Sequence, residues 1–169
     1  MGLNRNGFEK RIQPGDRVLI DTSVLIAYFG TPEADETHGL ATILIDEFVM
    51  SGRNEAVVSP VTAMELLVRP LKAGPRAAAH VHDFLTHTAH LKLLSTDLFV
   101  AQEAANLRAT YNFRAPDALV AATGIVAQVT HLVTNDKDWE TKLVPLKTRI
   151  KVTYLRNYMT PDAPPATTP

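Results

Sequence analysis

The sequence predicts an α/β fold in which a central parallel sheet carries helices on both faces. Short apolar runs alternate with helical patterns along the chain, and strands separated by helices form parallel sheets through right-handed crossovers. The length of 169 residues, with 46% hydrophobic and 21% charged residues, is typical of one globular domain. The absence of cysteine excludes a disulfide scaffold, a thiolate zinc site and a cysteine nucleophile.

The two ends of the chain differ in composition from the body, which we place at residues 16–158. Residues 1–15 are polar, lack the apolar stretch of a signal peptide, and are expected to form a loosely held extension. Residues 159–169 contain four of the eleven prolines and are expected to form a disordered tail. No apolar stretch is long enough to span a membrane, so we expect a cytoplasmic protein without membrane association.

The N-terminal half of the body begins with a buried strand that ends in an acid. We expect two strands, at residues 17–21 and 55–59, and four helical segments, at residues 23–29, 32–51, 60–69 and 75–88. The longest segment has an apolar stripe with the helical period and ends at Gly52. Ser59 followed by Pro60 is a typical helix start, and Pro70 is expected to end that helix.

The C-terminal half continues the alternation of strands and helices. We expect strands at residues 91–94, 131–134 and 150–155, and helices from residue 95 or 96 to 111 and from 116 to 128. Ser95 or Thr96 would cap the first of these helices, and Pro116 would open the second. Ligands of such sheets bind at the carboxyl ends of the strands, so residues at strand ends and at the following helix starts are the candidates for function.

Acidic side chains occur at these positions. Asp21 directly follows one apolar strand, and Asp136 follows another by two residues, with Asp138 close behind. Glu65 lies among apolar neighbours in the helix after the second strand, where a carboxylate is expected to be half buried. Asp117 lies in the first turn of its helix.

Each of these acids, taken alone, has an ordinary structural explanation. Asp21 and Asp117 could cap helices or favour the helix dipole, and Asp136 could belong to an Asn-Asp turn. Glu65 could extend into solvent. Their convergence on one sheet edge points to a cation, because clustered carboxylates otherwise repel one another. Oxygen ligands without His or Cys suit Mg²⁺ or Mn²⁺, and such ions commonly activate water for phosphoryl transfer.

Four sequence motifs surround these acids. They are Leu19-Ile-Asp21-Thr-Ser23-Val-Leu, Ser59-Pro-Val-Thr-Ala-Met-Glu65-Leu, Ala115-Pro-Asp117-Ala-Leu-Val-Ala-Ala and Leu132-Val-Thr134-Asn-Asp136-Lys-Asp138-Trp139. In their order and spacing over about residues 17–155, they resemble the PIN-domain ribonucleases, most closely the VapC-like toxins of type II toxin–antitoxin systems. The resemblance implies a three-layer α/β/α sandwich and Mg²⁺- or Mn²⁺-dependent cleavage of single-stranded or loop RNA.

The resemblance also implies roles for individual residues. Carried over by position, the catalytic and metal-binding acids are Asp21, Glu65, Asp117 and Asp136, with Asp138 as an additional metal ligand. Glu65 would hold a second metal ion or position the attacking water as a base. Ser23 and Thr134 match the hydroxyl positions beside the metal. The resemblance further implies a cognate antitoxin that presents an Arg to the carboxylates, and a homodimer, for which the helices near residues 34–51 and 61–90 are candidate contact surfaces.

The net charge of −1 argues against binding of nucleic acid through bulk positive charge. The chain has 17 basic and 18 acidic residues, so the part outside the five candidate acids is mildly cationic. Arg114, three residues before Asp117, and Arg69 are the candidate substrate ligands, because arginine commonly contacts phosphates. Lys72, Arg76 and Arg108 are further candidates, although any one of these side chains could be an ordinary solvated charge.

Three other interpretations remain open. A PIN-like module could bind RNA or protein without turnover, although its typical sign, the loss of acids, is not seen. A phosphatase with Asp21 as nucleophile would need a second acid at position 23, where this chain has Ser23. His80, Asp83, His87 and His90 would share one helix face and could bind a transition metal, or could form an ordinary solvated face.

Overall fold

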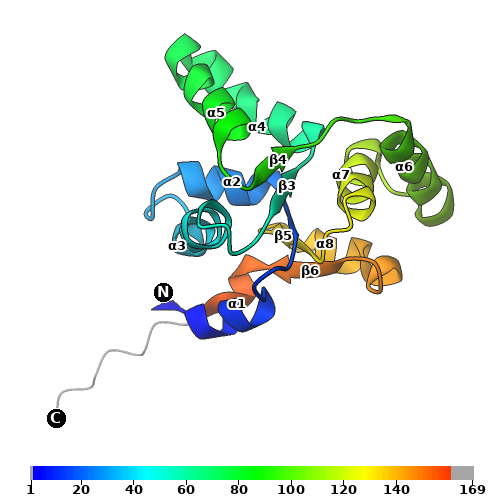
Figure 1. Ribbon diagram of the computed structural model, residues 1–169, viewed down its shortest axis with the longest axis horizontal. Coiled ribbons are helices and arrows are strands. Elements are labelled where there is room, and N and C mark those ends of the chain that lie inside the picture. The colour runs from blue at the N-terminus through cyan, green and yellow to red at the C-terminus, as the bar shows by residue number, and fades with distance from the viewer. Residues whose placement is uncertain (1, 161–169) are drawn as a thin grey trace.

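The computed structural model describes residues 2–160, and a five-stranded parallel sheet forms its centre (Figure 1). The strands are β2 (Val18–Ile20), β3 (Ala56–Val58), β4 (Leu91–Leu93), β5 (His131–Thr134) and β6 (Lys151–Tyr154), arranged in the order β4-β3-β2-β5-β6. In the middle strand β2, Val18 aligns with Ala56 of β3 and with His131 of β5. Because all neighbouring strands are parallel, their carboxyl ends meet at one edge of the sheet.

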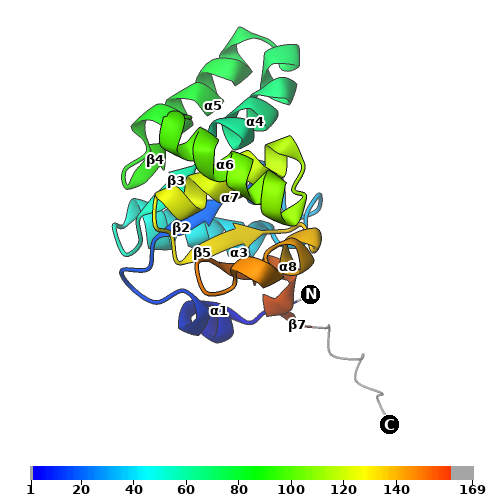
Figure 2. The same ribbon diagram turned by 90° about the vertical axis from the view of Figure 1, so that its right-hand side faces the viewer.

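Helices connect the strands and cover both faces of the sheet. They are α2 (Thr22–Phe29), α3 (His38–Thr42), the π-helical segment η1 (Ile43–Met50), α4 (Pro60–Ala73), α5 (Pro75–His87), α6 (Leu98–Tyr111), α7 (Ala115–Val126), α8 (Asp138–Lys142) and the short 3-10 helix η2 (Val144–Leu146). In two perpendicular views, α4 and α5 extend beyond the β4 edge of the sheet (Figures 1 and 2). Of the helices within residues 2–160, none has the length and apolar character needed to cross a membrane.

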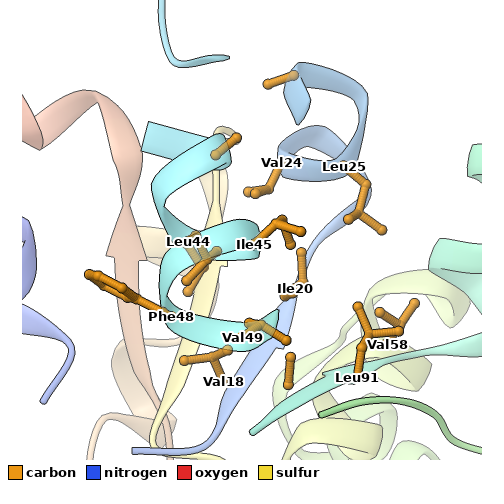
Figure 3. Packing of buried hydrophobic residues seen from close by; sticks show 14 of the residues in the cluster. Val18, Ile20, Val24, Leu25, Leu44, Ile45, Phe48, Val49, Val58 and Leu91 are labelled. Carbon is orange, nitrogen blue, oxygen red and sulfur yellow. The ribbon is translucent and has the colours of Figure 1, made fainter. Parts of the chain in front are cut away.

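Alternate residues of β2 face the two helical layers. Val18 and Ile20 pack in a cluster with apolar side chains of α2 and η1, such as Val24 and Phe48 (Figure 3). Leu19, between them, packs on the opposite face with side chains of α6, α7 and α8. All three strand residues are fully buried. This alternation confirms the predicted three-layer α/β/α sandwich, because a strand buried on both faces needs a helical layer on each.

The N-terminal segment forms α1 (Arg5–Arg11), so the expectation of a loosely held extension is wrong for these residues. Phe8 and Ile12 are fully buried, and Phe8 stacks on Phe48 with ring centroids 5.5 Å apart. The polar composition of the segment obscures these two apolar residues, which lie four positions apart and therefore on one face of a helix. Residues counted as an extension thus contribute to the core.

The two ends of the described chain pair with each other. β1 (Gly2–Leu3) runs antiparallel to β7 (Met159–Thr160), which follows the 3-10 helix η3 (Leu155–Tyr158). Residues 159 and 160, predicted as the start of a disordered tail, are therefore part of a two-stranded sheet. Residues 161–169 lie outside the described residues, and the domain boundaries at 16 and 158 stay a prediction.

Three helix ends also differ from the expected elements. The helix predicted from residue 32 begins only at His38, because Asp35 accepts the backbone N–H of Thr37 at 2.8 Å and holds a turn before it. The helix predicted to end before Pro70 continues through it to Ala73. The helix expected to be capped by residue 95 or 96 is capped by Asp97, whose carboxylate accepts the Val100 N–H at 2.9 Å.

Candidate active site

The five predicted acids lie at the carboxyl edge of the sheet or on the helices that begin there. Asp21 follows β2, and Asp136 and Asp138 follow its neighbour β5. Glu65 lies in the second turn of α4, and Asp117 lies in the first turn of α7. In the fold, α2 contacts both α4 and β5, and α4 contacts α7. The topology therefore gathers elements from four separate parts of the sequence around Asp21.

Asp21 is the most enclosed of these acids, with 9% of its surface exposed. Its Oδ2 atom accepts hydrogen bonds from Ser23 Oγ at 2.8 Å and from Thr134 Oγ1 at 2.7 Å. Burial raises the pKa of Asp21, the two hydroxyls oppose that rise, and the negative charge of Asp136 adds to it. Its side chain makes no capping hydrogen bond to α2, so the helix-cap explanation does not account for its position.

Ser23 and Thr134 form a hydroxyl cluster with Asp21. Their oxygen atoms lie 3.3 Å apart, and Ser23 Oγ also accepts the backbone N–H of Asn135 at 2.9 Å. Thr134 Oγ1 accepts the backbone N–H of Asp136 at 2.9 Å. The cluster thus ties the end of β5 to the start of α2 and fixes the orientation of the Asp21 carboxylate. Both hydroxyls contact Asp21, whereas the position beside a metal ion that the resemblance implies for them stays a prediction.

Glu65 is exposed, so the expected half-buried environment is wrong. The neighbouring apolar residues Met64 and Val68 are themselves 61% and 44% exposed, and this face of α4 is open to solvent. The Glu65 carboxylate nevertheless points toward the site, because its Oε2 accepts a hydrogen bond from Thr22 Oγ1 at 2.6 Å. Thr22 follows Asp21 directly, and its role was not predicted.

Asp117 forms an ion pair that the sequence did not predict. Its Oδ2 lies 3.0 Å from Nζ of Lys142, the last residue of α8. The ammonium group also lies 5.1 Å from the ring centroid of Trp139, which is 3% exposed. Lys142 was missed because only the tertiary packing of α8 beside α7 brings it to Asp117.

Asp136 and Asp138 form the turn that begins α8. Asp136 Oδ1 accepts the backbone N–H of Asp138 at 2.9 Å, so the structural explanation of Asp136 as a turn residue holds. This hydrogen bond involves Oδ1 and not Oδ2 of Asp136. Asp138 and Asp117 line one cavity of about 400 Å³ beside the sheet edge.

The chemistry of this donor set fits a hard divalent cation, because it consists of carboxylates without His or Cys. Lys142 places one positive charge against Asp117. Within residues 2–160, no three His, Cys, Asp or Glu side chains lie close enough to hold a metal ion as they stand. Mutual repulsion disfavours a tighter cluster when no cation separates the carboxylates.

The structure separates the two candidate substrate arginines. Arg114 lines the cavity of Asp117 and Asp138. Arg69, one helical turn after Glu65, lines a different cavity of about 320 Å³ together with Ile26 of α2. Lys72, Arg76 and Arg108 are exposed side chains on α4, α5 and α6.

The histidine-rich segment does not form the alternative metal site. α5 ends at His87, and His90 follows in a left-handed conformation with φ of 60°. His90 therefore does not share a helix face with His80, which is exposed. The finding that no three metal-ligating side chains gather within residues 2–160 applies to this segment as well.

Comparisons with known proteins agree with this fold. The PIN domain family matches residues 18–142. A toxin–antitoxin complex from Klebsiella pneumoniae has 21% identity, a TM-score of 0.59 and coverage of 82% of this chain and 97% of that chain. VapBC2 from Rickettsia felis, bound to a promoter DNA fragment, has 14% identity, a TM-score of 0.59 and coverages of 82% and 98%. VapC20 from Mycobacterium tuberculosis, a toxin that cleaves the sarcin-ricin loop, has 18% identity, a TM-score of 0.55 and coverages of 73% and 93%. Comparison with curated proteins gives no match.

At these identities the solved structures establish a common fold. The family match extends from the start of β2 to the end of α8, so it includes all five acids as well as Ser23, Thr134 and Lys142. It also covers most of the chain. This chain belongs to the PIN domain family.

Proposed function

We propose that the chain is a metal-dependent endoribonuclease that hydrolyses phosphodiester bonds in single-stranded or loop RNA, and that it is the toxin of a toxin–antitoxin pair. The observation that carries this proposal is the buried Asp21 carboxylate, which accepts hydrogen bonds from Ser23 and Thr134 and lies near the negative charge of Asp136. Such an arrangement costs stability unless it binds a cation. Membership of the PIN domain family supports the nuclease assignment.

Each acid has a role in this proposal. Asp21, Asp117 and Asp136 would hold a Mg²⁺ or Mn²⁺ ion, with Asp138 as a further ligand. Such an ion, when bound, lowers the pKa of a water molecule and polarises a phosphate oxygen. Glu65, held by Thr22 at 2.6 Å, would orient the attacking water and accept its proton, or serve as a ligand of a second ion.

The surrounding residues would support this chemistry. Ser23 and Thr134 keep the Asp21 carboxylate in one orientation, and hydrogen bonds of this kind tune metal ligands. Arg114 would contact a substrate phosphate, since it lies in the cavity beside Asp117. Arg69, which lies farther along α4 than Glu65, would contact the RNA outside this cavity.

RNA cleavage tests the nuclease assignment directly. A labelled tRNA is incubated with the wild-type chain, with Asp21→Asn and with Asp83→Asn, a matched change at an exposed position of α5, in Mn²⁺, Mg²⁺ or EDTA. We expect metal-dependent cleavage at few sites by the wild type and by Asp83→Asn, and none by Asp21→Asn. Equal cleavage by all three proteins would identify a contaminant.

A PIN-like binding module without turnover is the second candidate. The observation that favours it is that, within the described residues, Asp117 is neutralised by Lys142 and no three acids converge. RNA and Mn²⁺ binding by the wild type without cleavage would support this alternative over the nuclease.

The toxin assignment draws support from the similar solved structures, which include complexes of toxins with antitoxins. A cognate antitoxin would place an Arg side chain against the acids, because a guanidinium pairs strongly with carboxylates. In a bacterial host we expect expression of the wild-type chain to arrest growth and expression of Asp21→Asn to leave growth unchanged. A cytoplasmic location belongs to the same proposal.

A homodimer is also part of the proposal. On α4, within the predicted contact range 61–90, Met64, Val68 and Leu71 are 61%, 44% and 66% exposed and follow one another at helical spacing. Burial of such a row against a second copy would remove apolar surface from water. We expect light scattering to show a dimer for the wild type and a monomer for Met64→Glu, whose charge opposes burial.

A further inference from the structure

The cavity beside Asp117 is lined by acidic side chains, basic side chains and an aromatic ring. It lies where α6 ends, α7 begins and α8 packs against them, and it has a volume of about 400 Å³. Asp117 and Asp138 contribute acidic groups, while Arg114 and Lys142 contribute cations. Tyr111, the last residue of α6, also lines it and is 41% exposed. The metal-binding role proposed above explains the acids but not the lysine or the tyrosine.

Lys142 competes with any cation that binds Asp117. Its ammonium lies 3.0 Å from Asp117 Oδ2, and its side chain is 30% exposed, so it can move without unpacking the core. The ring centroid of the buried Trp139 lies 5.1 Å from the ammonium. A divalent ion on Asp117 would repel the ammonium, which then needs another anion within reach. In a nuclease, the anion delivered to this position is a phosphate of the substrate.

Tyr111 gives the same cavity a flat, solvent-accessible ring. Asn112 follows it in the left-handed conformation, with φ of 57°, and turns the chain back toward α7. This turn places Tyr111 and Arg114 along one cavity. Single-stranded nucleic acids are bound in this way, with bases stacked on aromatic side chains and phosphates held by cations.

We propose that this cavity binds a nucleotide that flanks the cleaved bond, with its base against Tyr111 and its phosphate held by Lys142 and Arg114. When a divalent ion binds the acids, Lys142 would leave Asp117 and pair with this phosphate instead. The inference rests on the proposed nuclease function and adds a substrate subsite to it. It makes Lys142 both a counter-ion of the metal-free site and a substrate ligand of the loaded site.

Binding of a fluorescent single-stranded RNA octamer tests the subsite without relying on cleavage. Anisotropy is measured over a salt series with Ca²⁺ in place of Mg²⁺, and a gel confirms that the octamer stays intact. We expect Lys142→Met to weaken binding about tenfold at low salt and to reduce the slope of log affinity against log salt by about 0.7, the loss of one phosphate contact. Lys142→Arg should keep the slope.

Two further variants separate stacking from charge and from general effects. Tyr111→Ala should weaken binding without changing the salt slope, and Tyr111→Phe should bind as the wild type does. Lys147→Met removes an exposed lysine that lies outside this cavity, near Arg11 and Val144, and should leave both affinity and slope unchanged. An unchanged slope in Lys142→Met, or unchanged affinity in Tyr111→Ala, would overturn the assignment.

Titration with Mn²⁺ in the absence of RNA tests the competition. Removal of a positive charge 3.0 Å from Asp117 should make Lys142→Met bind Mn²⁺ more tightly than the wild type, whereas a lysine that merely supports the fold would give equal or weaker binding.

If the wild type cleaves RNA but the variants bind the octamer normally, only this inference fails. If the wild type neither binds Mn²⁺ nor cleaves RNA, the proposed function fails. Displacement of the octamer by polyglutamate, insensitive to Tyr111→Ala, would assign the cavity to an acidic protein segment instead.

Discussion

Asp21 has two hydroxyl donors, an acidic neighbour and almost no contact with solvent. Burial raises its pKa, and the hydrogen bonds from Thr134 and Ser23 limit that rise. Because only an ionised carboxylate binds a metal ion well, the hydroxyls would set the pH range in which the proposed site binds its metal ion.

Thr134→Val should therefore reduce both metal affinity and cleavage. The change keeps the shape of the side chain but removes the donor 2.7 Å from Asp21, so the pKa of Asp21 should rise further. Loss of such a supporting hydrogen bond typically costs about 10- to 100-fold in affinity or activity. A pH–rate profile should show the acidic limb moved to higher pH in Thr134→Val and restored in Thr134→Ser. An unchanged limb would mean that Thr134 does not act through Asp21.

His131 provides a pH dependence of stability that is independent of the candidate site. His131 is 1% exposed, with Nδ1 2.9 Å from Thr153 Oγ1 and Nε2 3.2 Å from Asp16 Oδ2. Burial lowers the pKa of His131, and Arg11 and Lys151 add to this effect, while Asp16 opposes it. The unfolded chain therefore binds the proton first, and stability should fall as the pH drops below about 6.5, the ordinary histidine pKa.

Urea unfolding at pH 7.5 and 5.5 measures this effect. We expect the wild type to lose free energy of unfolding between these pH values and His131→Gln to lose less. Other groups titrate equally in both proteins, so the difference isolates His131. The prediction is contradicted if both proteins respond to pH in the same way.

At the scale of single elements, α1 is the helix whose importance the composition of the chain conceals. Phe8 packs on Phe48, and its ring also lies 5.4 Å from that of Tyr158 in η3. α1 therefore joins the η1 layer to the C-terminal end of the described chain. A segment of this kind stabilises the fold although it lies outside the matched family range.

Phe8→Ala should lower the free energy of unfolding by about 3 kcal/mol, because it removes a fully buried ring and leaves a cavity. Phe99→Ala is the matched control, since Phe99 is 74% exposed, and its effect should stay within about 0.5 kcal/mol. Denaturant unfolding of the two variants provides the comparison. Equal effects would show that α1 does not pack on the core in solution.

Local sequence signals predict the elements that carry the acids, and tertiary packing decides the rest. The apolar residues of β2 and β5, each followed by an acid, are sufficient to place Asp21 and Asp136 at one edge of the sheet. The exposure of Glu65 was not predictable, because nothing in the sequence of α4 shows which apolar neighbours remain uncovered. Lys142 lies 25 positions from Asp117 in the sequence, and no local pattern relates them.

At the scale of the whole molecule, the burial of the Asp21 carboxylate lowers the stability of the fold when no cation is bound. An ionised carboxylate at Asp21 is buried and lies near the negative charge of Asp136. Without a metal ion, both the desolvation of Asp21 and its repulsion by Asp136 destabilise the fold. A ligand that binds only the folded state adds stability, about 2.7 kcal/mol at a concentration of 100 times its Kd.

Mn²⁺ should therefore raise the melting temperature of the wild type by about 5–10 °C at that concentration. Asp21→Asn should be more stable than the wild type without metal, since it removes the buried charge, and should show little shift with Mn²⁺. Asp83→Asn should behave as the wild type in both conditions. Differential scanning calorimetry with and without Mn²⁺ checks both effects, and a wild type that does not respond to millimolar Mn²⁺ would contradict the metal site.

The pairing of β1 with β7 places a condition on synthesis of the protein. β1 and the face of α1 that contacts Tyr158 are synthesised before the rest of the described chain, yet their partners are residues 158–160. All five acids will already have been synthesised when β1 and α1 still lack their partners at residues 158–160. The structure of residues 2–160 is therefore complete only after residues 158–160 have been made, and a nascent chain stalled before residue 158 would leave uncovered the side of Phe8 that contacts Tyr158.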